Sequence, residues 1–227
     1  MNTSTKPEYV VYKNKLLRRI LVKTHIITEK DSILEIINQY VAPLLLPNDI
    51  VTISESVVAI TQGRAIKVSK IRPRILAKLL WRFVRKVPYG IGLRNPYSME
   101  CAFRECGTTR ILVAAFISAF AKLVRRKGDF YRICGIQAAM IDAPGTAGLA
   151  QFRDCVILGP QKPHLVVSNL ALKFQTPFAI VDANDIFGCT VVACSHPCYN
   201  DLISYVLDDN PMGQGAECTP IAIIRGY

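Results

Sequence analysis

The segment from Thr176 to Ser195, TPFAIVDANDIFGCTVVACS, places two carboxylates, Asp182 and Asp185, on either side of Asn184 at the end of an apolar run. The apolar part contains β-branched residues and predicts a strand that is buried on both faces. The aspartates would then lie at the carboxyl end of this strand, where open sheets commonly place ligand groups. Carboxylates there can bind a hard cation such as Mg²⁺, which needs only one or two of them together with substrate phosphates. The alternative is an Asx turn, in which these side chains bond to nearby backbone N–H groups.

A third carboxylate, Asp142, has a comparable setting in the stretch GIQAAMIDAPGTAG. It ends an apolar segment and precedes Ala-Pro-Gly. Two strand ends of this kind can share one cation, so Asp142, Asp182 and Asp185 are the candidate metal ligands. A turn cap is again the alternative for Asp142.

Both helices and strands are expected around these residues. A helix is expected in the stretch TEKDSILEIINQYVAPLL, with Thr28 as its N-cap. Further helices are expected after Pro96, over 109–124 and over 164–174. Short β segments are expected at FYRICGIQ, DCVILGP, FAIVDAND, GCTVVAC and TPIAIIR. Because helices and strands mix without strict βαβ alternation, we predict an α/β (α+β) fold with mixed sheets rather than a doubly wound Rossmann sheet.

Residues 71–86 predict a strongly amphipathic helix in which Ile75, Leu79 and Phe83 face inward. A cationic stripe runs along the helix at i, i+4 spacing and consists of Arg74, Lys78, Arg82 and Arg85. This stripe could bind a phosphate, an anionic membrane or a nucleic acid, and a solvated helix face is the plain alternative. The single tryptophan and the absence of a nucleic-acid module argue against nucleic acid. A membrane-surface protein that uses this helix stays open as a third hypothesis, although a membrane is not the partner we expect.

Composition and charge restrict the class of protein. The chain has 227 residues, of which 51% are hydrophobic, and this excludes a disordered protein. Residues 1–132 hold 24 Lys/Arg and 9 Asp/Glu, a net charge of +15. Residues 133–227 hold 4 Lys/Arg and 8 Asp/Glu, a net charge of −4. Such a division suits an anionic ligand on one side and a cation on the other, with ordinary solubility as the alternative.

The first residues are polar and basic, and the longest apolar run, Ile111 to Ala121, is too short to span a bilayer. We therefore expect a cytoplasmic protein in which the eight cysteines are reduced. We expect one unit over residues 1–227, with two possible sub-domains, a basic helical part over 1–128 and a β-rich metal-site part over 129–227.

Three stretches together resemble one family, the coenzyme F-420-0:L-glutamate ligases, also called γ-glutamyl ligases. ISESVVAITQGR (Ile53 to Arg64) is similar to a strand–helix element of that family. FYRICGIQAAMIDAPG (Phe130 to Gly145) is similar to the segment whose aspartate binds a metal. IVDANDIFG, followed by GQGAECTPIAI (Gly213 to Ile223), is similar to the Asp-Thr-Phe-Gly and Gly-Gln-Thr elements.

The resemblance implies a GTP- and Mg²⁺- or Mn²⁺-dependent ligase that activates a carboxylate as an acyl phosphate, which the amine of L-glutamate then attacks. It also implies an intertwined homodimer. Asp142 and Asp185 match metal-binding aspartates, and Asp182 is an additional candidate. The resemblance assigns no catalytic residue, and it places the nucleotide near Ser54, Glu55, Ser56, Arg64 and Gln214.

The chain departs from the family pattern at several positions. The family usually has lysines where this chain has Ser56 and near Ile60. It has an asparagine at the position of Gly145 and an arginine at that of Cys189. Lost cationic contacts to a phosphate weaken nucleotide binding, since each is worth roughly 1.5–3 kcal/mol. The alternative is therefore a non-catalytic paralogue that binds an anionic ligand or partner.

Overall fold

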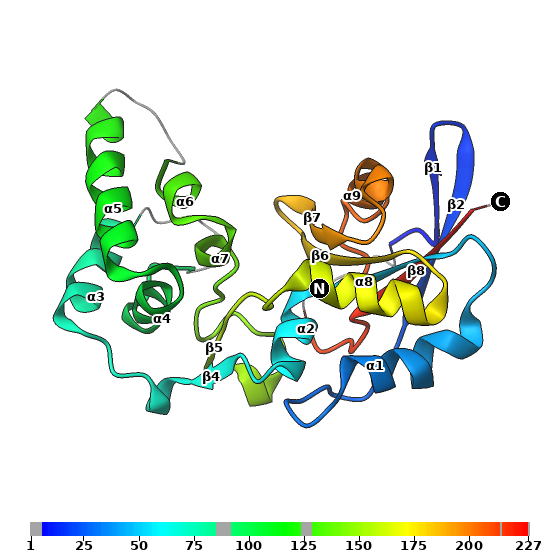
Figure 1. Cartoon of the computed structure of the whole chain (residues 1–227), viewed down its shortest axis with the longest axis horizontal. Coiled ribbons are helices and arrows are strands. Elements are labelled where there is room, and N and C mark those ends of the chain that lie inside the picture. Colours follow the sequence, from blue (N-terminus) through cyan, green and yellow to red (C-terminus); the bar gives the residue numbers. More distant parts are fainter. Residues whose placement is uncertain (1–5, 85–91, 124–128, 214, 227) are drawn as a thin grey trace. The chain divides into compact units, whose positions relative to one another are not determined.

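The computed structural model describes residues 6–84, 92–123, 129–213 and 215–226 (Figure 1). The chain divides into two compact units. The sheet unit comprises residues 1–62 and 160–227, and the inserted unit comprises Gly63–Gly159. The boundary expected from the sequence between residues 128 and 129 falls inside the inserted unit.

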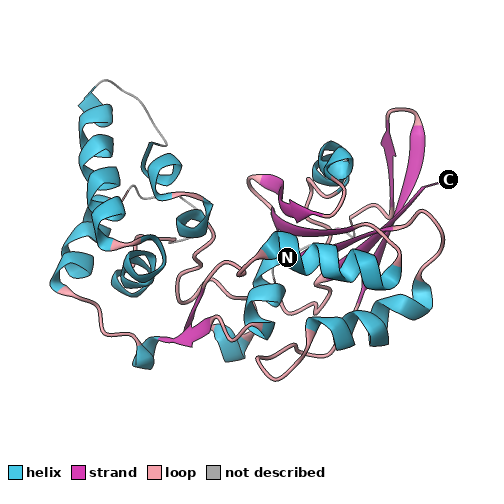
Figure 2. Cartoon of the chain, in the orientation of Figure 1, coloured by secondary structure: helices cyan, strands magenta, loops and turns pink. Residues whose placement is uncertain are grey.

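A six-stranded mixed sheet forms the centre of the sheet unit, with the strand order β1-β2-β8-β3-β6-β7 (Figure 2). Only β3 and β6 run parallel among these neighbours, and the other pairs are antiparallel. The mixed α+β, non-Rossmann fold predicted from the sequence is therefore confirmed. The strands are β1 (Tyr9–Tyr12), β2 (Lys15–Val22), β3 (Ile50–Ser54), β6 (Phe178–Asn184), β7 (Gly188–Cys194) and β8 (Ile221–Gly226).

Helices cover the sheet because its central strands are apolar on both faces. α2 (Glu55–Thr61) contacts β3 and β6, and α8 (Pro163–Phe174) contacts β6 and β7. α9 (Asn200–Val206) packs against β7 and β1. The first four residues of β6, Phe178–Val181, are completely buried, as predicted for a strand covered on both sides.

The helix expected to be capped by Thr28 instead begins at Ile33, after a turn formed by Thr28 and Asp31. α1 (Ile33–Ile36) follows Ser32 and continues into a π-helical segment, Ile37–Val41, and a 3₁₀ turn, Ala42–Leu44. The prediction of Thr28 as the N-cap was wrong, because the Asp31 carboxylate accepts hydrogen bonds from the backbone N–H and the hydroxyl of Thr28 (2.7 and 2.8 Å). This turn uses the cap-forming side chains before the helix starts.

The inserted unit is mainly helical and has its own core, centred on α4 and on residues such as Met99, Phe103 and Ile111. Its helices are α3 (Ile75–Leu80), α4 (Pro96–Cys106), α5 (Thr108–Leu123), α6 (Asp129–Cys134) and α7 (Ile136–Ala139), and its strands are β4 (Ala65–Lys67) and β5 (Cys155–Ile157). The stretch FYRICGIQ was expected to be β and is helical, in α6 and α7. Gly135, at φ +89°, separates these two short helices.

The helix predicted over 71–86 is shorter, and the face of it that was expected to be buried is exposed. α3 and the 3₁₀ turn Trp81–Phe83 form it, and Arg85 and Lys86 lie outside the described residues. Ile75 is 84% exposed and Leu79 49%, whereas Ala77 is completely buried. The inward-facing prediction was therefore wrong, because the small side chain of Ala77 makes the close contact with the core instead.

None of the described helices has the length and apolar character needed to cross a membrane. All eight cysteines are free thiols, and most of them are buried, as the sequence suggested.

Candidate functional site

The carboxyl ends of the two parallel strands lie side by side in the sheet unit. Ser54 is the register partner of Val181, so Glu55, the first residue after β3, and Asp182, the next residue of β6, lie at the same end of the two parallel strands. Glu55 is buried in the first turn of α2, and Ser56 is half-buried beside it. The structure thus brings Ser54, Glu55 and Ser56 to the same edge as one predicted metal ligand.

The turn between β6 and β7 is closed by Asn184 rather than by the aspartates. The Asn184 Oδ1 atom accepts hydrogen bonds from the backbone N–H groups of Ile186 (3.2 Å) and Phe187 (2.6 Å). The Asx turn considered for this segment therefore exists, but the amide side chain forms it. The two aspartates make other contacts, Asp182 with the Asn184 side chain and Asp185 with Lys6.

Asp182 is a carboxylate held in an apolar environment. Burial raises the pKa of the Asp182 carboxyl, and a hydrogen bond with the Asn184 side chain partly opposes this shift. Burial disfavours the charged form, which a nearby cation would stabilise. A carboxylate of this kind at a strand end is a candidate for a functional role, because perturbed pKa values cluster at such sites.

The raised pKa of Asp182 predicts a pH-dependent effect of the substitution Asp182→Asn. Below the ordinary value of 3.8, the aspartate is neutral in both the folded and the unfolded chain. As the pH rises from there through the raised folded-state pKa, the folded wild-type protein binds more protons than the unfolded one, so its stability falls. The variant does not titrate, and it should therefore gain stability over the wild type at neutral pH but not below pH 3.8. Urea unfolding midpoints at the two pH values test this, and an equal difference at both would contradict it.

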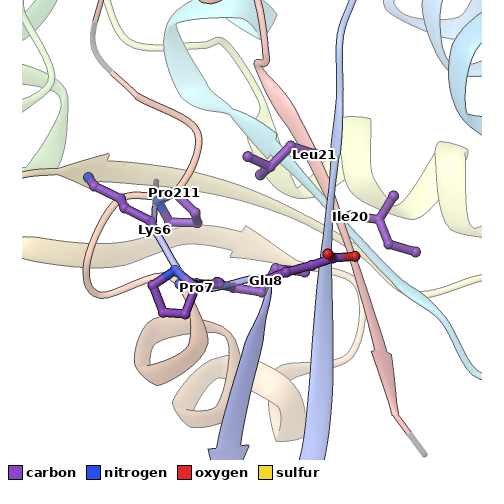
Figure 3. Close-up of a pocket in the computed structure, with 7 residues that line it drawn as sticks. Lys6, Pro7, Glu8, Ile20, Leu21 and Pro211 are labelled. Atoms are coloured by element: carbon purple, nitrogen blue, oxygen red, sulfur yellow. Dashed lines mark hydrogen bonds between the residues drawn. The ribbon is translucent and has the colours of Figure 1, made fainter. Parts of the chain in front are cut away.

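Asp185 pairs with Lys6, which also borders a cavity (Figure 3). The Lys6 Nζ atom lies 2.6 Å from Asp185 Oδ1 and donates to the Asn210 carbonyl (2.7 Å). The cavity has a volume of about 300 Å³, and Figure 3 shows Lys6 and Pro211 on one side of it and Ile20 on another. The sequence did not identify Lys6, since a lysine near a terminus carries no local signal of a partner 179 residues away.

Two carboxylates surround the Cys189 thiol at the start of β7. Burial, together with the negative charges of Asp182 and Asp208, raises the pKa of Cys189 to about 12. The thiol is therefore neutral at physiological pH. It supplies neither a thiolate nucleophile nor the positive charge of the arginine expected at this position. Asp208 was missed by the sequence analysis, although the acidic pair in VLDDNP was a visible signal.

Gly188 fits closely against Asp208 and is expected to tolerate no side chain. Its φ is +75°, and a Cβ atom there would lie 2.1 Å from Asp208 Oδ1. Gly188→Ala should therefore cost at least about 1–2 kcal/mol of unfolding free energy from the left-handed backbone alone. Gly63→Ala is the matched control, because Gly63 has φ +70° and open space around it. Urea denaturation should show a larger loss at position 188, and equal losses would contradict the contact with Asp208.

Asp142 and Arg64 belong to the inserted unit. The backbone of Asp142 forms an antiparallel bridge with Ile157 (N···O 2.8 and 3.2 Å), and Ile157 in turn pairs with Ala65 of β4. The Arg64 guanidinium forms an ion pair with Glu105 and donates to the Gly159 carbonyl (2.6 Å). These contacts join Arg64 to the last residue of the unit, and its predicted contact with the nucleotide stays a prediction.

The predicted aspartates fit a metal site that is completed by substrate and water better than one made of protein side chains alone. Within the described ranges, no group of three or more His, Cys, Asp and Glu side chains could hold a metal ion. Asp182 and Asp185 belong to the sheet unit and Asp142 to the inserted unit. The carboxylates therefore fit an ion that takes one or two of them and completes its coordination with substrate oxygens and water. The metal assignment stays a prediction, and Gln214 lies outside the described residues.

Comparison with known proteins places the chain in a family. A family model described as F420-0:Gamma-glutamyl ligase matches residues 21–173, which are 153 of the 227 residues. A search of curated proteins finds no match. The matched range includes Ser54, Glu55, Ser56, Arg64 and Asp142, whereas Asp182, Asp185 and Gln214 follow it.

Proposed function

The chain belongs to the F420-0:gamma-glutamyl ligase family, and we propose that it forms an amide bond between a carboxylate substrate and the amine of L-glutamate. The observation that carries this proposal is the family match over two thirds of the chain. The sheet edge that presents Ser54, Glu55 and Asp182 together supports it, because open sheets commonly bind ligands at the carboxyl ends of their strands.

The proposed reaction has two steps and uses GTP as the co-substrate. A carboxylate oxygen of the acid attacks the γ-phosphorus of GTP, the bond to the bridging oxygen breaks and GDP leaves. The glutamate amine, after losing a proton, attacks the acyl carbon, and inorganic phosphate leaves with the electrons of the C–O bond. Most of the catalysis in such phosphoryl transfer comes from positioning and electrostatic stabilisation.

The predicted aspartates would hold the divalent ion, which takes one or two carboxylates and completes its coordination with substrate phosphates and water. Asp182 and Asp185 are the candidate ligands in the sheet unit, and Asp142 is a separate candidate in the inserted unit. A Mg²⁺ or Mn²⁺ ion would neutralise charge on the transferring phosphoryl group. A homodimer in the cytoplasm, where both GTP and L-glutamate are present, is part of the same proposal.

Calorimetry with GTP and Mn²⁺, followed by a ligation assay, tests the proposed function. We expect GTP binding that depends on Mn²⁺, and release of phosphate that requires both L-glutamate and an acid such as coenzyme F-420-0. Mass spectrometry should then detect the glutamyl amide. Absence of GTP binding in the presence of Mn²⁺ would contradict the proposal.

A non-catalytic relative that binds an anionic ligand or partner is the second candidate. It is favoured by the contacts of Arg64, whose guanidinium already bonds Glu105 and Gly159, and by the burial of Ile60 near an expected family lysine. Both features reduce the positive charge available to a nucleotide. Binding of GTP without any phosphate release, with every acid tested, would support this candidate.

A further inference from the structure

The positive charge of the protein is concentrated in the inserted unit. Residues 63–159 contain 18 Lys/Arg and 5 Asp/Glu, a net charge of +13, whereas the remaining residues contain 10 and 12, a net charge of −2. The two values sum to the +11 of the chain. Residues 56–99 contain ten basic residues and no Asp or Glu. This long stretch includes α3.

One side of α3 exposes large apolar side chains to solvent. Ile75 is 84% exposed, Leu79 49% and Leu76 38%, although they lie on a helix that contacts α4. At 100° per residue, Ile75 and Leu79 lie opposite Ala77, which is completely buried. We call Ile75, Leu76 and Leu79 the α3 apolar face. Figure 1 shows α3 and α4 in the inserted unit.

Two cations border the α3 apolar face. The same spacing places Lys78 and Arg82 side by side, next to Ile75 and on the side away from Leu76. Neither forms an ion pair with a carboxylate in the described part of the chain, and the Arg82 guanidinium lies 5.4 Å from the Trp81 ring centre. Arg74, by contrast, is held by Glu100, with Nε–Oε1 at 3.0 Å. The predicted cationic stripe thus separates into one structural arginine and two solvent-facing cations.

We propose that the α3 apolar face, with Lys78 and Arg82, binds the surface of an anionic lipid bilayer. An apolar stripe bordered by Lys and Arg is the pattern of helices that lie in a membrane interface. The apolar side chains would enter the acyl boundary, and the cations would meet the lipid headgroups. A membrane surface was one of the partners that the sequence left open for this helix, and the exposure of Ile75 and Leu79 is the observation that now favours it.

Charge distinguishes a membrane from two other occupants of this face. A second copy docked through the same face would bring together two units of net charge +13, which repel each other. An RNA would engage the cations but would gain little from exposed aliphatic side chains, since nucleic-acid affinity comes mainly from phosphate contacts and aromatic stacking. Of these three occupants, an anionic membrane is the one that uses both the apolar and the cationic residues.

Co-sedimentation of the full chain with lipid vesicles tests the proposal and is independent of ligase activity. We expect binding to vesicles of phosphatidylcholine with phosphatidylserine, and weak binding to phosphatidylcholine alone. Ile75→Ser/Leu79→Ser should abolish most of the binding without loss of stability, because both side chains are exposed. Lys78→Glu/Arg82→Glu should weaken it by at least about 25-fold, since each basic residue near an anionic surface contributes roughly fivefold.

Matched controls in the sheet unit keep the test specific. Leu172→Ser removes from α8 a leucine whose exposure (72%) lies between those of Leu79 and Ile75, and Lys30→Glu/Lys173→Glu makes the same change in charge at exposed positions. Both should bind vesicles as the wild type does. The proposal is overturned if the controls lose binding equally, or if Phe116→Ser, at a 66% exposed position of α5, removes it while the α3 variant does not. It is also overturned if wild-type protein binds an RNA oligonucleotide but no vesicle, or if Ile75→Ser/Leu79→Ser changes only the oligomeric state.

Discussion

Replacing Asp49 by alanine is expected to lower the free energy of unfolding by about 3–5 kcal/mol, the usual cost of removing one partner from a buried ion pair. Asp49 is completely buried. Its Oδ1 atom accepts from Arg225 Nε (2.9 Å), and its Oδ2 atom accepts from Arg225 Nη2 (2.7 Å) and from the Leu46 backbone N–H (2.8 Å). The substitution removes the carboxylate from a part-buried guanidinium on β8 and also breaks the turn that leads into β3.

Urea denaturation measures this effect, and two other variants define its origin. Asp201→Ala, at an exposed position in the first turn of α9, should change the stability by less than about 1 kcal/mol. Asp49→Asn keeps the shape and an acceptor oxygen, so its loss should lie between the two. If Asp49→Ala costs no more than Asp201→Ala, the ion pair with Arg225 does not stabilise the connection between β3 and β8.

The segment 176–195 shows what local pattern can predict. Its apolar, β-branched run identified a strand with two covered faces, because such a composition has few other stable placements in a protein. The first four residues of strand β6 are buried as expected, Asp182 follows them in the strand, and Asp185 comes directly after its last residue. The pattern could not decide which polar side chain closes the turn, since Asn and Asp compete for the same backbone N–H groups. Asn184 does so.

Helix α3 shows what the local sequence pattern cannot predict. Periodicity in 71–86 correctly indicated an amphipathic helix, but it does not say which face has a partner. The choice was made by packing: Ala77 allows a close approach to the core, and Arg74 is held by Glu100 from α4. Neither contact has a signature in the residues of α3 itself. The same limit applies to Lys6 and Asp185, whose pairing depends on the fold of the whole sheet unit.

The division of the chain into units determines which predicted metal ligands belong to the same unit. The sequence treated Asp142 and Asp185 as ends of comparable strands, and it expected a boundary between residues 128 and 129. The contacts divide the chain instead at residues 62–63 and 159–160, so Asp142 belongs to a unit inserted between α2 and α8. No local pattern reports such an insertion, because both crossing points lie in ordinary loops next to short strands.

Asp142→Asn and Asp185→Asn are each expected to reduce glutamate ligation by at least about 100-fold, if the carboxylates hold the ion of the proposed reaction. A metal ion contributes several kcal/mol of charge stabilisation to such a transition state, and each 1.36 kcal/mol is about tenfold in rate. The amide has nearly the shape of the carboxylate but no charge, so it weakens cation binding with little change in packing. Phosphate release from GTP, measured over a range of Mn²⁺ concentrations, should show the loss and its partial recovery at high metal.

Stability measurements separate this effect from damage to the fold. Asp185 is half-exposed and pairs with Lys6 (2.6 Å), and an exposed pair of this kind contributes only about 0–1 kcal/mol. Asp185→Asn should therefore unfold at nearly the wild-type urea concentration, and Lys6→Gln, which breaks the same pair but keeps the carboxylate, should retain Mn²⁺-dependent activity. A variant that ligates glutamate normally at low Mn²⁺ would remove its aspartate from the metal assignment, while the family membership and the proposed ligase reaction would stand. Equal losses in Lys6→Gln and Asp185→Asn would instead assign the effect to the ion pair, because only the second variant changes a metal-binding group.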